Sequence, residues 1–150
     1  MNPYDQYKKN AVLTASPEQI LIMLYDGAIN FLNVSKRAIE EKQIELAHNN
    51  IVKAQKILQE FMNTLDMDAN KEVAENLLRL YDYLYHTLVQ ANIKKDISKI
   101  DEVIGHLKVL KETWEQAIRI SVKESGGEDM FEEEEPKMRL EFDYGKVYEG

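Results

Sequence analysis

The sequence contains no cysteine among its 150 residues. The chain therefore has no disulfide, thiol nucleophile or cysteine metal site, which fits a reducing cytosol. No apolar run approaches the roughly 18 residues that a membrane span requires, and the first ten residues lack the apolar core of a signal peptide. We therefore expect a cytoplasmic protein with no membrane insertion.

An excess of basic charge is also missing. The formal net charge is −8, and it is spread unevenly along the chain. Residues 1–125 carry 16 basic and 18 acidic residues, whereas residues 126–150 carry 3 basic and 9 acidic residues. Because nucleic-acid binding depends on neutralising phosphates with Lys and Arg, we expect no nucleic-acid partner. The body is nearly neutral and is followed by an acidic tail.

Catalytic and metal-binding motifs are absent too. There is no nucleophile elbow, phosphate loop or dinucleotide-binding glycine pattern. His48, His86 and His106 fall in different predicted helices, and Glu45 with His48 gives only one of the two Glu-x-x-His units that a di-iron bundle needs. Catalysis requires titratable groups that converge in a cleft. We therefore expect no enzyme, no cofactor and no metal site, and a metal-binding bundle remains only as an alternative.

Four long amphipathic segments make up most of the chain. The first begins with a Ser-x-x-Gln capping box, Ser16 to Gln19, and Pro17 suits the first helical position. The apolar periodicity predicts helices over about 17–41, 43–65 and 71–93, and a fourth helix that is capped by Asp96 or Ser98 and runs to about 123. Asn70 can cap the third, and Gly126 and Gly127 stop the fourth. Short loops between helices of this length favour an all-α, antiparallel up-down four-helix bundle.

The two ends differ from this body. Residues 1–15 form a mainly polar cap segment, with too little apolar area to order itself alone, which docks on the body or stays mobile. In residues 126–150 a run of four glutamates precedes an alternating apolar stretch, 138–144, that has the period of a strand. We expect a four-helix body over 1–125 and a mostly disordered tail over 126–150. An extended segment laid in a groove is the alternative for the tail.

The helices carry more apolar surface than one core stripe of about 100° requires. Segment 17–41 is apolar on several faces, and segment 71–93 adds a second apolar row and three tyrosines, which suit interfaces. Gly27 marks either close approach of a neighbouring backbone or a notch for a partner helix. Surplus apolar surface indicates a protein-binding site, and homodimerisation through the same surface is the alternative.

Several blocks of sequence are specific enough to suggest a family. They are NPYDQYKKNAVLTASPEQILIMLYDGAINFL (2–32), IVKAQKIL (51–58), ENLLRLYDYLYHTLVQANIKKD (75–96) and the tryptophan of KETWEQA (Trp114). Through them the chain closely resembles the flagellar secretion chaperone FliS family over about residues 2–120. The resemblance implies a bundle that binds the disordered C-terminal segment of flagellin. It also implies that the protein prevents premature polymerisation and delivers the subunit to the flagellar type III export apparatus.

The resemblance further implies that the N-terminal segment can cover part of the client groove when no client is bound. Here that role falls to Tyr4, Tyr7, Val12 and Leu13. After about residue 120 the likeness fades, and the alternating stretch 138–144 is a candidate competitor for the client groove. A structural four-helix protein that only homodimerises, with no client, is the rival interpretation.

The client is expected to fold into grooves between helices, with apolar anchors at i, i+3, i+4 and i+7. Asp26 and Asp82, inside apolar helices, are either polar anchors within such a groove or ordinary exposed carboxylates. The candidate groove residues lie on or beside the second apolar rows of three helices. They are Ile22, Tyr25, Asp26 and Ile29 in the first, Leu78, Tyr81, Asp82 and Tyr85 in the third, and Leu107, Leu110 and Trp114 in the fourth. Of these, the three in the fourth helix are expected to belong rather to the core.

Overall fold

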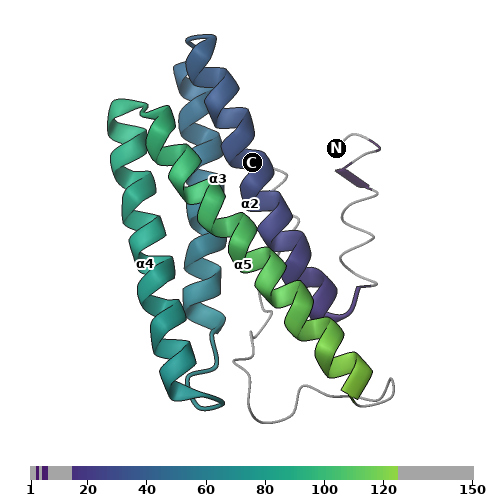
Figure 1. The fold of residues 1–150 in the computed structure, drawn as a ribbon. Coiled ribbons are helices and arrows are strands. Elements are labelled where there is room, and N and C mark those ends of the chain that lie inside the picture. The colour runs from purple at the N-terminus through teal and green to yellow at the C-terminus, as the bar shows by residue number, and fades with distance from the viewer. Residues whose placement is uncertain (1–2, 4, 7–14, 125–150) are drawn as a thin grey trace.

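The computed structural model describes residues 3, 5, 6 and 15–124, and these contain four long helices. They are α2 (Pro17–Glu40), α3 (Ile44–Thr64), α4 (Lys71–Lys94) and α5 (Ile97–Glu124). Successive helices run in opposite directions (Figure 1). The predicted all-α, up-down four-helix bundle is therefore confirmed. The cap segment up to residue 14, apart from residues 3, 5 and 6, and the acidic tail lie outside the described residues.

The helix ends follow from local hydrogen bonding. At the start of α2 the Ser16 hydroxyl accepts a hydrogen bond from the Gln19 N–H at 3.2 Å, and the Gln19 side chain accepts one from the Ser16 N–H at 2.9 Å. This is the reciprocal capping box that the sequence predicts. The Asn70 carboxamide likewise accepts a hydrogen bond from the Val73 N–H at 3.2 Å and starts α4.

Two lysines end helices in place of glycine. Lys42, between α2 and α3, has a φ of 61°, and Lys95, after α4, has a φ of 50°. Both lie in the left-handed region that glycine usually occupies at such positions. This explains why neither glycine nor proline marks the break near residue 42 in the sequence.

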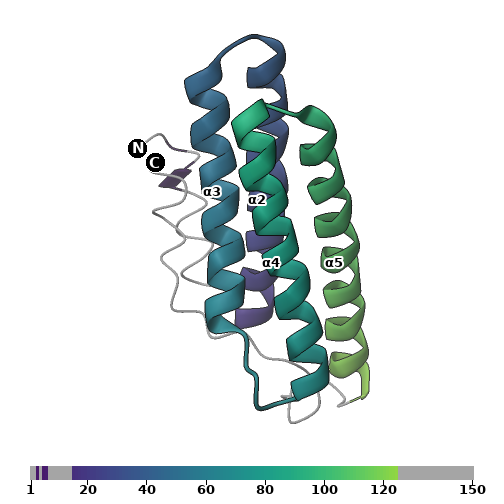
Figure 2. The ribbon, with the colours of Figure 1, turned by 90° about the vertical axis from the view of Figure 1, so that its left-hand side faces the viewer.

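The helices pack as a ring in chain order. α2 lies against α3 and α5, and α4 lies against α3 and α5. Figure 2 shows the four rods side by side along their length. The largest fully buried side chains come from all four helices. They are Tyr25, Leu24 and Leu32 of α2, Ile51, Ile57, Leu58 and Phe61 of α3, Tyr81, Leu84 and Leu88 of α4, and Ile100 and Leu107 of α5. Each such side chain stabilises the fold by about 1.5–3 kcal/mol.

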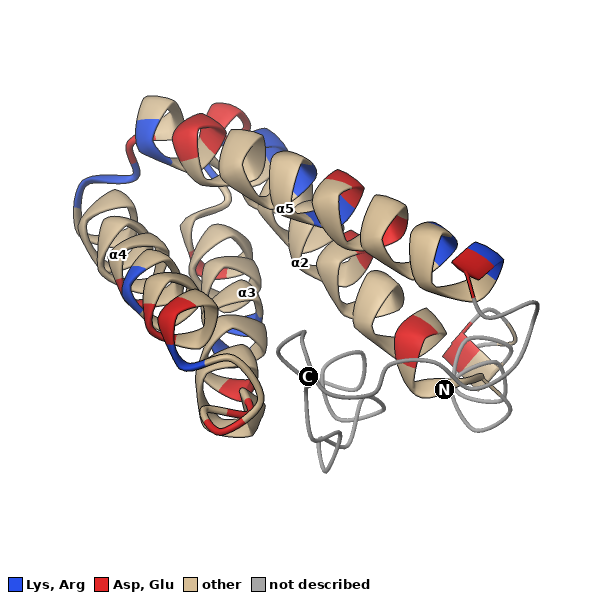
Figure 3. Cartoon of the chain, turned by 60° about the horizontal axis from the view of Figure 1, so that its bottom comes forward, with Lys and Arg blue, Asp and Glu red and all other residues tan. Residues whose placement is uncertain are grey.

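Two ion pairs show the register between α2 and α5. The Lys111 ammonium lies 2.7 Å from the Asp26 carboxylate, and the Lys36 ammonium lies 2.5 Å from the Asp101 carboxylate. The charges are reversed between the two pairs, so the antiparallel alignment satisfies both. Extending this register toward the start of α2 places residues 15–22, the first turns of α2 with the two residues before it, opposite residues 115–122 of α5. Figure 3 shows α2 and α5 together on one side of the bundle.

A groove between helices α2 and α5 as the candidate functional site

A groove of about 720 Å³ lies between the first turns of α2 and the last turns of α5. It lies beyond the Asp26–Lys111 ion pair, toward the start of α2 and the end of α5. Its walls mix apolar side chains with a few charged ones. The lining residues are Ala15, Ser16, Glu18, Gln19, Ile22, Met23, Glu115, Ile118, Arg119 and Val122.

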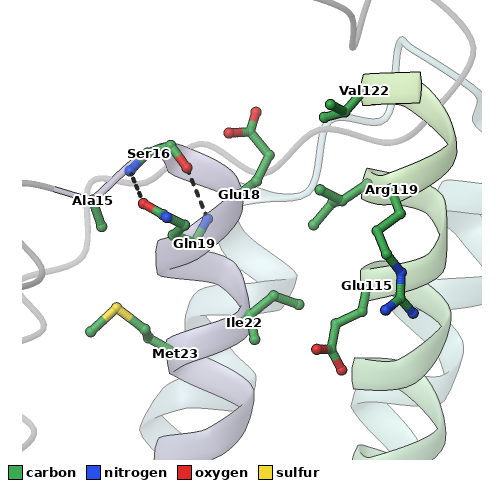
Figure 4. A pocket seen from close by; sticks show the side chains of 10 residues that line it. Ala15, Ser16, Glu18, Gln19, Ile22, Met23, Glu115, Arg119 and Val122 are labelled. Atoms are coloured by element: carbon green, nitrogen blue, oxygen red, sulfur yellow. Dashed lines mark hydrogen bonds between the residues drawn. The ribbon is translucent and has the colours of Figure 1, made fainter. Parts of the chain in front are cut away.

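The arrangement of the lining follows from helical spacing. Ile22 extends from α2 toward α5, and Val122 extends from α5 toward the start of α2 (Figure 4). Ile118 and Val122 are four residues apart and so lie on one face of α5. Glu115 and Arg119 have the same spacing, and the Arg119 side chain runs toward Glu115 along that helix. The groove thus has apolar walls with charged groups of both signs beside them.

Such a lining is suited to holding an amphipathic peptide. Apolar walls supply burial, and a few charged groups at the edge can orient a bound segment. Within the described residues, no group of three or more His, Cys, Asp or Glu side chains is placed to hold a metal ion. None of the helices in this part of the chain is both long enough and apolar enough to cross a membrane.

Tyr25 and Tyr81, predicted as groove residues, instead lie in the core, and neither has exposed surface. Their hydroxyl oxygens are 2.6 Å apart, which joins α2 to α4 across the bundle. The Phe61 ring of α3 packs against both rings, with centroid distances of 4.6 Å to Tyr25 and 5.2 Å to Tyr81. Their placement on an exposed groove is therefore corrected, because the structure uses both rings to fill the centre of the bundle.

This environment also changes the acidity of the two phenols. Burial, followed by the neighbouring Tyr81, raises the pKa of Tyr25 well above its ordinary value. Burial raises the pKa of Tyr81 to about 12, and hydrogen bonding with Tyr25 and Trp114 acts in the opposite direction. Both phenols are therefore neutral at physiological pH, as a buried hydroxyl pair should be.

Three further predicted residues are buried. Ile29 of α2 was expected on the groove but is only 8% exposed and belongs to the core, so that expectation is also corrected. Leu107 and Leu110 of α5 are core residues, as expected for them. Trp114 packs against the core but stays partly exposed, so it lies at the boundary.

Gly27 is buried as well, which favours close approach of a neighbouring segment over an open notch.

The predicted acidic residues have nearby partners on the bundle itself. Asp26 is about half exposed and pairs with Lys111, and the hydrogen bond to Asp26 raises the pKa of Lys111. Asp82 is exposed, and its carboxylate lies 3.4 Å from a ring nitrogen of His86, one turn further along α4. Asp26 thus joins two helices, and Asp82 faces solvent on the outer side of α4.

Leu78 and Tyr85 of α4 are partly buried and keep some exposed surface. The Tyr85 hydroxyl accepts a hydrogen bond from the Gln59 side chain of α3 at 3.5 Å. Ile22 is the predicted residue that the structure places in the α2–α5 groove. Four other predicted residues, Tyr4, Tyr7, Val12 and Leu13, lie outside the described residues.

Most of the groove lining was not singled out from the sequence. Met23, Glu115, Ile118, Arg119 and Val122 all contribute to it. Ile118 continues the apolar stripe of the last predicted helix, so the sequence indicates core rather than groove. The signal that finds these residues is the register set by Asp26–Lys111 and Lys36–Asp101, which is a tertiary property.

The sequence matches one family model, described as flagellar protein FliS, over residues 1–121. The chain is 40% identical over 126 residues to the flagellar secretion chaperone FliS of Bacillus subtilis (strain 168), covering 84% of this chain and 93% of that protein. It is 36% identical over 109 residues to the flagellar secretion chaperone FliS of Salmonella typhimurium, covering 72% and 81%. A solved flagellar chaperone from bacteria has the same fold, with a TM-score of 0.65 at 19% identity over 77% of this chain and 94% of that one.

Proposed function

The chain belongs to the FliS family of flagellar secretion chaperones, and on that premise we propose that its client is the disordered C-terminal segment of flagellin. By covering this segment in the cytoplasm, the bundle prevents premature polymerisation and supports delivery of flagellin to the export apparatus. The role is one of binding, with no catalytic step. The observation that carries the proposal is the α2–α5 groove, with apolar walls and charged residues beside them.

The energetics favour a peptide that folds as it binds. Ordering a disordered segment costs about 2–5 kcal/mol or more, and burial of apolar surface returns about 25 cal/mol per Å². The client must therefore contact more than one patch. Ile22 and Ile118 offer apolar surface in the groove, and Leu78 and Tyr85 offer part of their surface on α4. A segment with apolar anchors at helical spacing matches such patches.

The test measures binding of a flagellin C-terminal peptide by titration calorimetry. We expect Ile22→Asp and Ile118→Asp each to weaken binding at least tenfold, about 1.4 kcal/mol, because a carboxylate replaces an apolar wall. Binding to the unchanged chain should show a strongly negative heat-capacity change, the mark of apolar burial. Circular dichroism checks that each variant keeps its helices.

The matched control is Val109→Asp, since Val109 also lies on α5 but is 63% exposed and does not line the groove. It should leave peptide affinity unchanged. An equal loss of peptide affinity in the control and in the groove variants would show that the groove is not the client site. A chain that binds no peptide and only self-associates in sedimentation would instead be a homodimerising structural protein.

A further inference from the structure

The chain continues beyond α5 at a point next to the groove. Val122 lines the groove, α5 ends at Glu124, and residues 125–150 follow. We propose that residues 138–144 of this chain bind in the α2–α5 groove and compete there with the client segment. The docking itself rests on the groove and the sequence, and only the competition rests on the proposed function.

The alternating stretch has the pattern that an apolar-walled groove accepts. In an extended chain, successive side chains point to opposite faces. One face of 138–144 then carries Met138, Leu140, Phe142 and Tyr144. Neighbouring side chains on that face are about 7 Å apart, whereas the eight residues from Glu115 to Val122 span about 10 Å of helix. Two of the four apolar side chains can therefore lie in the groove at once.

The charges of the two surfaces are complementary. The other face of the stretch carries Arg139, Glu141 and Asp143. Beside the groove, Arg119 can pair with one of these carboxylates, and Glu18 or Glu115 can pair with the guanidinium of Arg139. Such exposed pairs add little affinity but fix orientation and register. A wholly acidic segment would lack the second of these pairings.

Residues 125–137, which link α5 to the alternating stretch, are long enough to reach the groove and short enough to keep the stretch near it. Residues 125–137 can span about 45 Å when extended, while the groove begins within one helical turn of the end of α5. A short flexible connection gives an effective concentration of about 1 mM. For the tail to occupy the groove in most molecules, the proposal requires an intrinsic dissociation constant of about 0.2 mM. The client would then bind about sixfold more weakly, because only the molecules whose groove is free of the tail can bind it.

The first test uses the full chain with Leu140→Ser and Phe142→Ser together. We expect the flagellin C-terminal peptide to bind this variant about sixfold more tightly than the unchanged chain. The matched control, Glu133→Ser with Glu134→Ser, changes the connection but not the alternating stretch, and it should leave affinity unchanged. Equal affinity of the apolar variant and the unchanged chain would overturn the competition.

The second test needs no flagellin. Because the sequence has no cysteine, Gly145→Cys provides a unique site for a nitroxide label. We expect the label to broaden the methyl NMR signals of Ile22 and Ile118 in the groove. Ile93, which is 76% exposed near the far end of α4, should be unaffected. Adding Leu140→Ser and Phe142→Ser should restore the broadened signals.

The two proposals can fail separately. Groove methyls no more broadened than that of Ile93 would overturn tail docking, even if flagellin binds. Broadened groove methyls in a chain that binds no flagellin peptide would overturn the proposed function and leave tail docking standing. Broadening that persists in the serine variant would show that the apolar face does not dock the tail, and would also overturn the inference.

Discussion

The hydroxyl pair of Tyr25 and Tyr81 gives the sharpest test of how the core is held together. The two oxygens are 2.6 Å apart, neither side chain has exposed surface, and they join helices on opposite sides of the ring. Replacing either tyrosine by phenylalanine removes one oxygen and keeps the ring that packs on Phe61. The perturbation is therefore confined to the hydrogen bonds of one hydroxyl, with the other tyrosine and with Trp114.

The expected magnitude follows from what each variant leaves behind. In Tyr25→Phe or Tyr81→Phe the remaining buried hydroxyl loses its phenolic partner but keeps the Trp114 side chain, so each single variant should lose about 0.5–1.5 kcal/mol. In the double variant both hydroxyls are gone, and the group that loses its partner is the N–H of Trp114, which is partly exposed and can bond to water. Replacing both partners by apolar groups is nearly neutral. The two single effects should therefore not add, and the coupling energy should be about 1–3 kcal/mol.

The assay is urea unfolding of the four chains, followed by circular dichroism, with the free energy taken from the midpoint and slope. Tyr83→Phe is the control, since Tyr83 is about half exposed and its hydroxyl donates to Glu102 at the surface. It should change the unfolding free energy by no more than about 0.5 kcal/mol. Additive losses, with the double variant as unstable as the sum of the singles, would refute the reasoning.

Three further predictions concern the same fold. Gly105→Ala should raise the unfolding free energy by about 0.5–1 kcal/mol, because this exposed residue lies inside α5 and an added Cβ would meet no atom within 4 Å; a loss in the urea titration would contradict this. Ser16→Ala should lower the unfolding free energy by about 1 kcal/mol by removing the α2 cap, whereas Ser16→Asp should retain most of it; equal loss in both would argue against capping. The folded pKa of Tyr81, about 12, exceeds its ordinary value of 10. Its stability contribution is thus complete below pH 10 and is lost as the pH rises through 12. Thermal melts should fall over that range less steeply in the Tyr25→Phe, Tyr81→Phe double variant, and identical pH profiles would exclude the pair as the cause.

The helices were predictable because their signals are local. The Ser16 capping box and the Asn70 cap act within three residues, and apolar periodicity is a property of each segment alone. The break at Lys42 was harder to place, since a left-handed lysine leaves no mark in the sequence. Short loops then left the up-down course as the natural arrangement.

The candidate site is harder to predict from the sequence than the helices are. Helix α2 is apolar on several faces, so the sequence could not say which row points inward. Helical spacing predicts Tyr25 on a second apolar row beside the core stripe, yet a second buried hydroxyl, that of Tyr81, satisfies its hydroxyl in the core. The partner comes from residue 81, far away in the chain, and only packing brings the two together.

The sequence by itself determined the number, length and antiparallel order of the helices, and the family to which the chain belongs. Tertiary structure alone decided which apolar rows became core and which remained as the walls of the α2–α5 groove. The physical reason is that helical periodicity fixes the relative positions of side chains around one axis. It does not fix how that axis is rotated or aligned against its neighbours. Here that alignment depends on contacts between distant residues, such as Asp26 with Lys111 and Tyr25 with Tyr81.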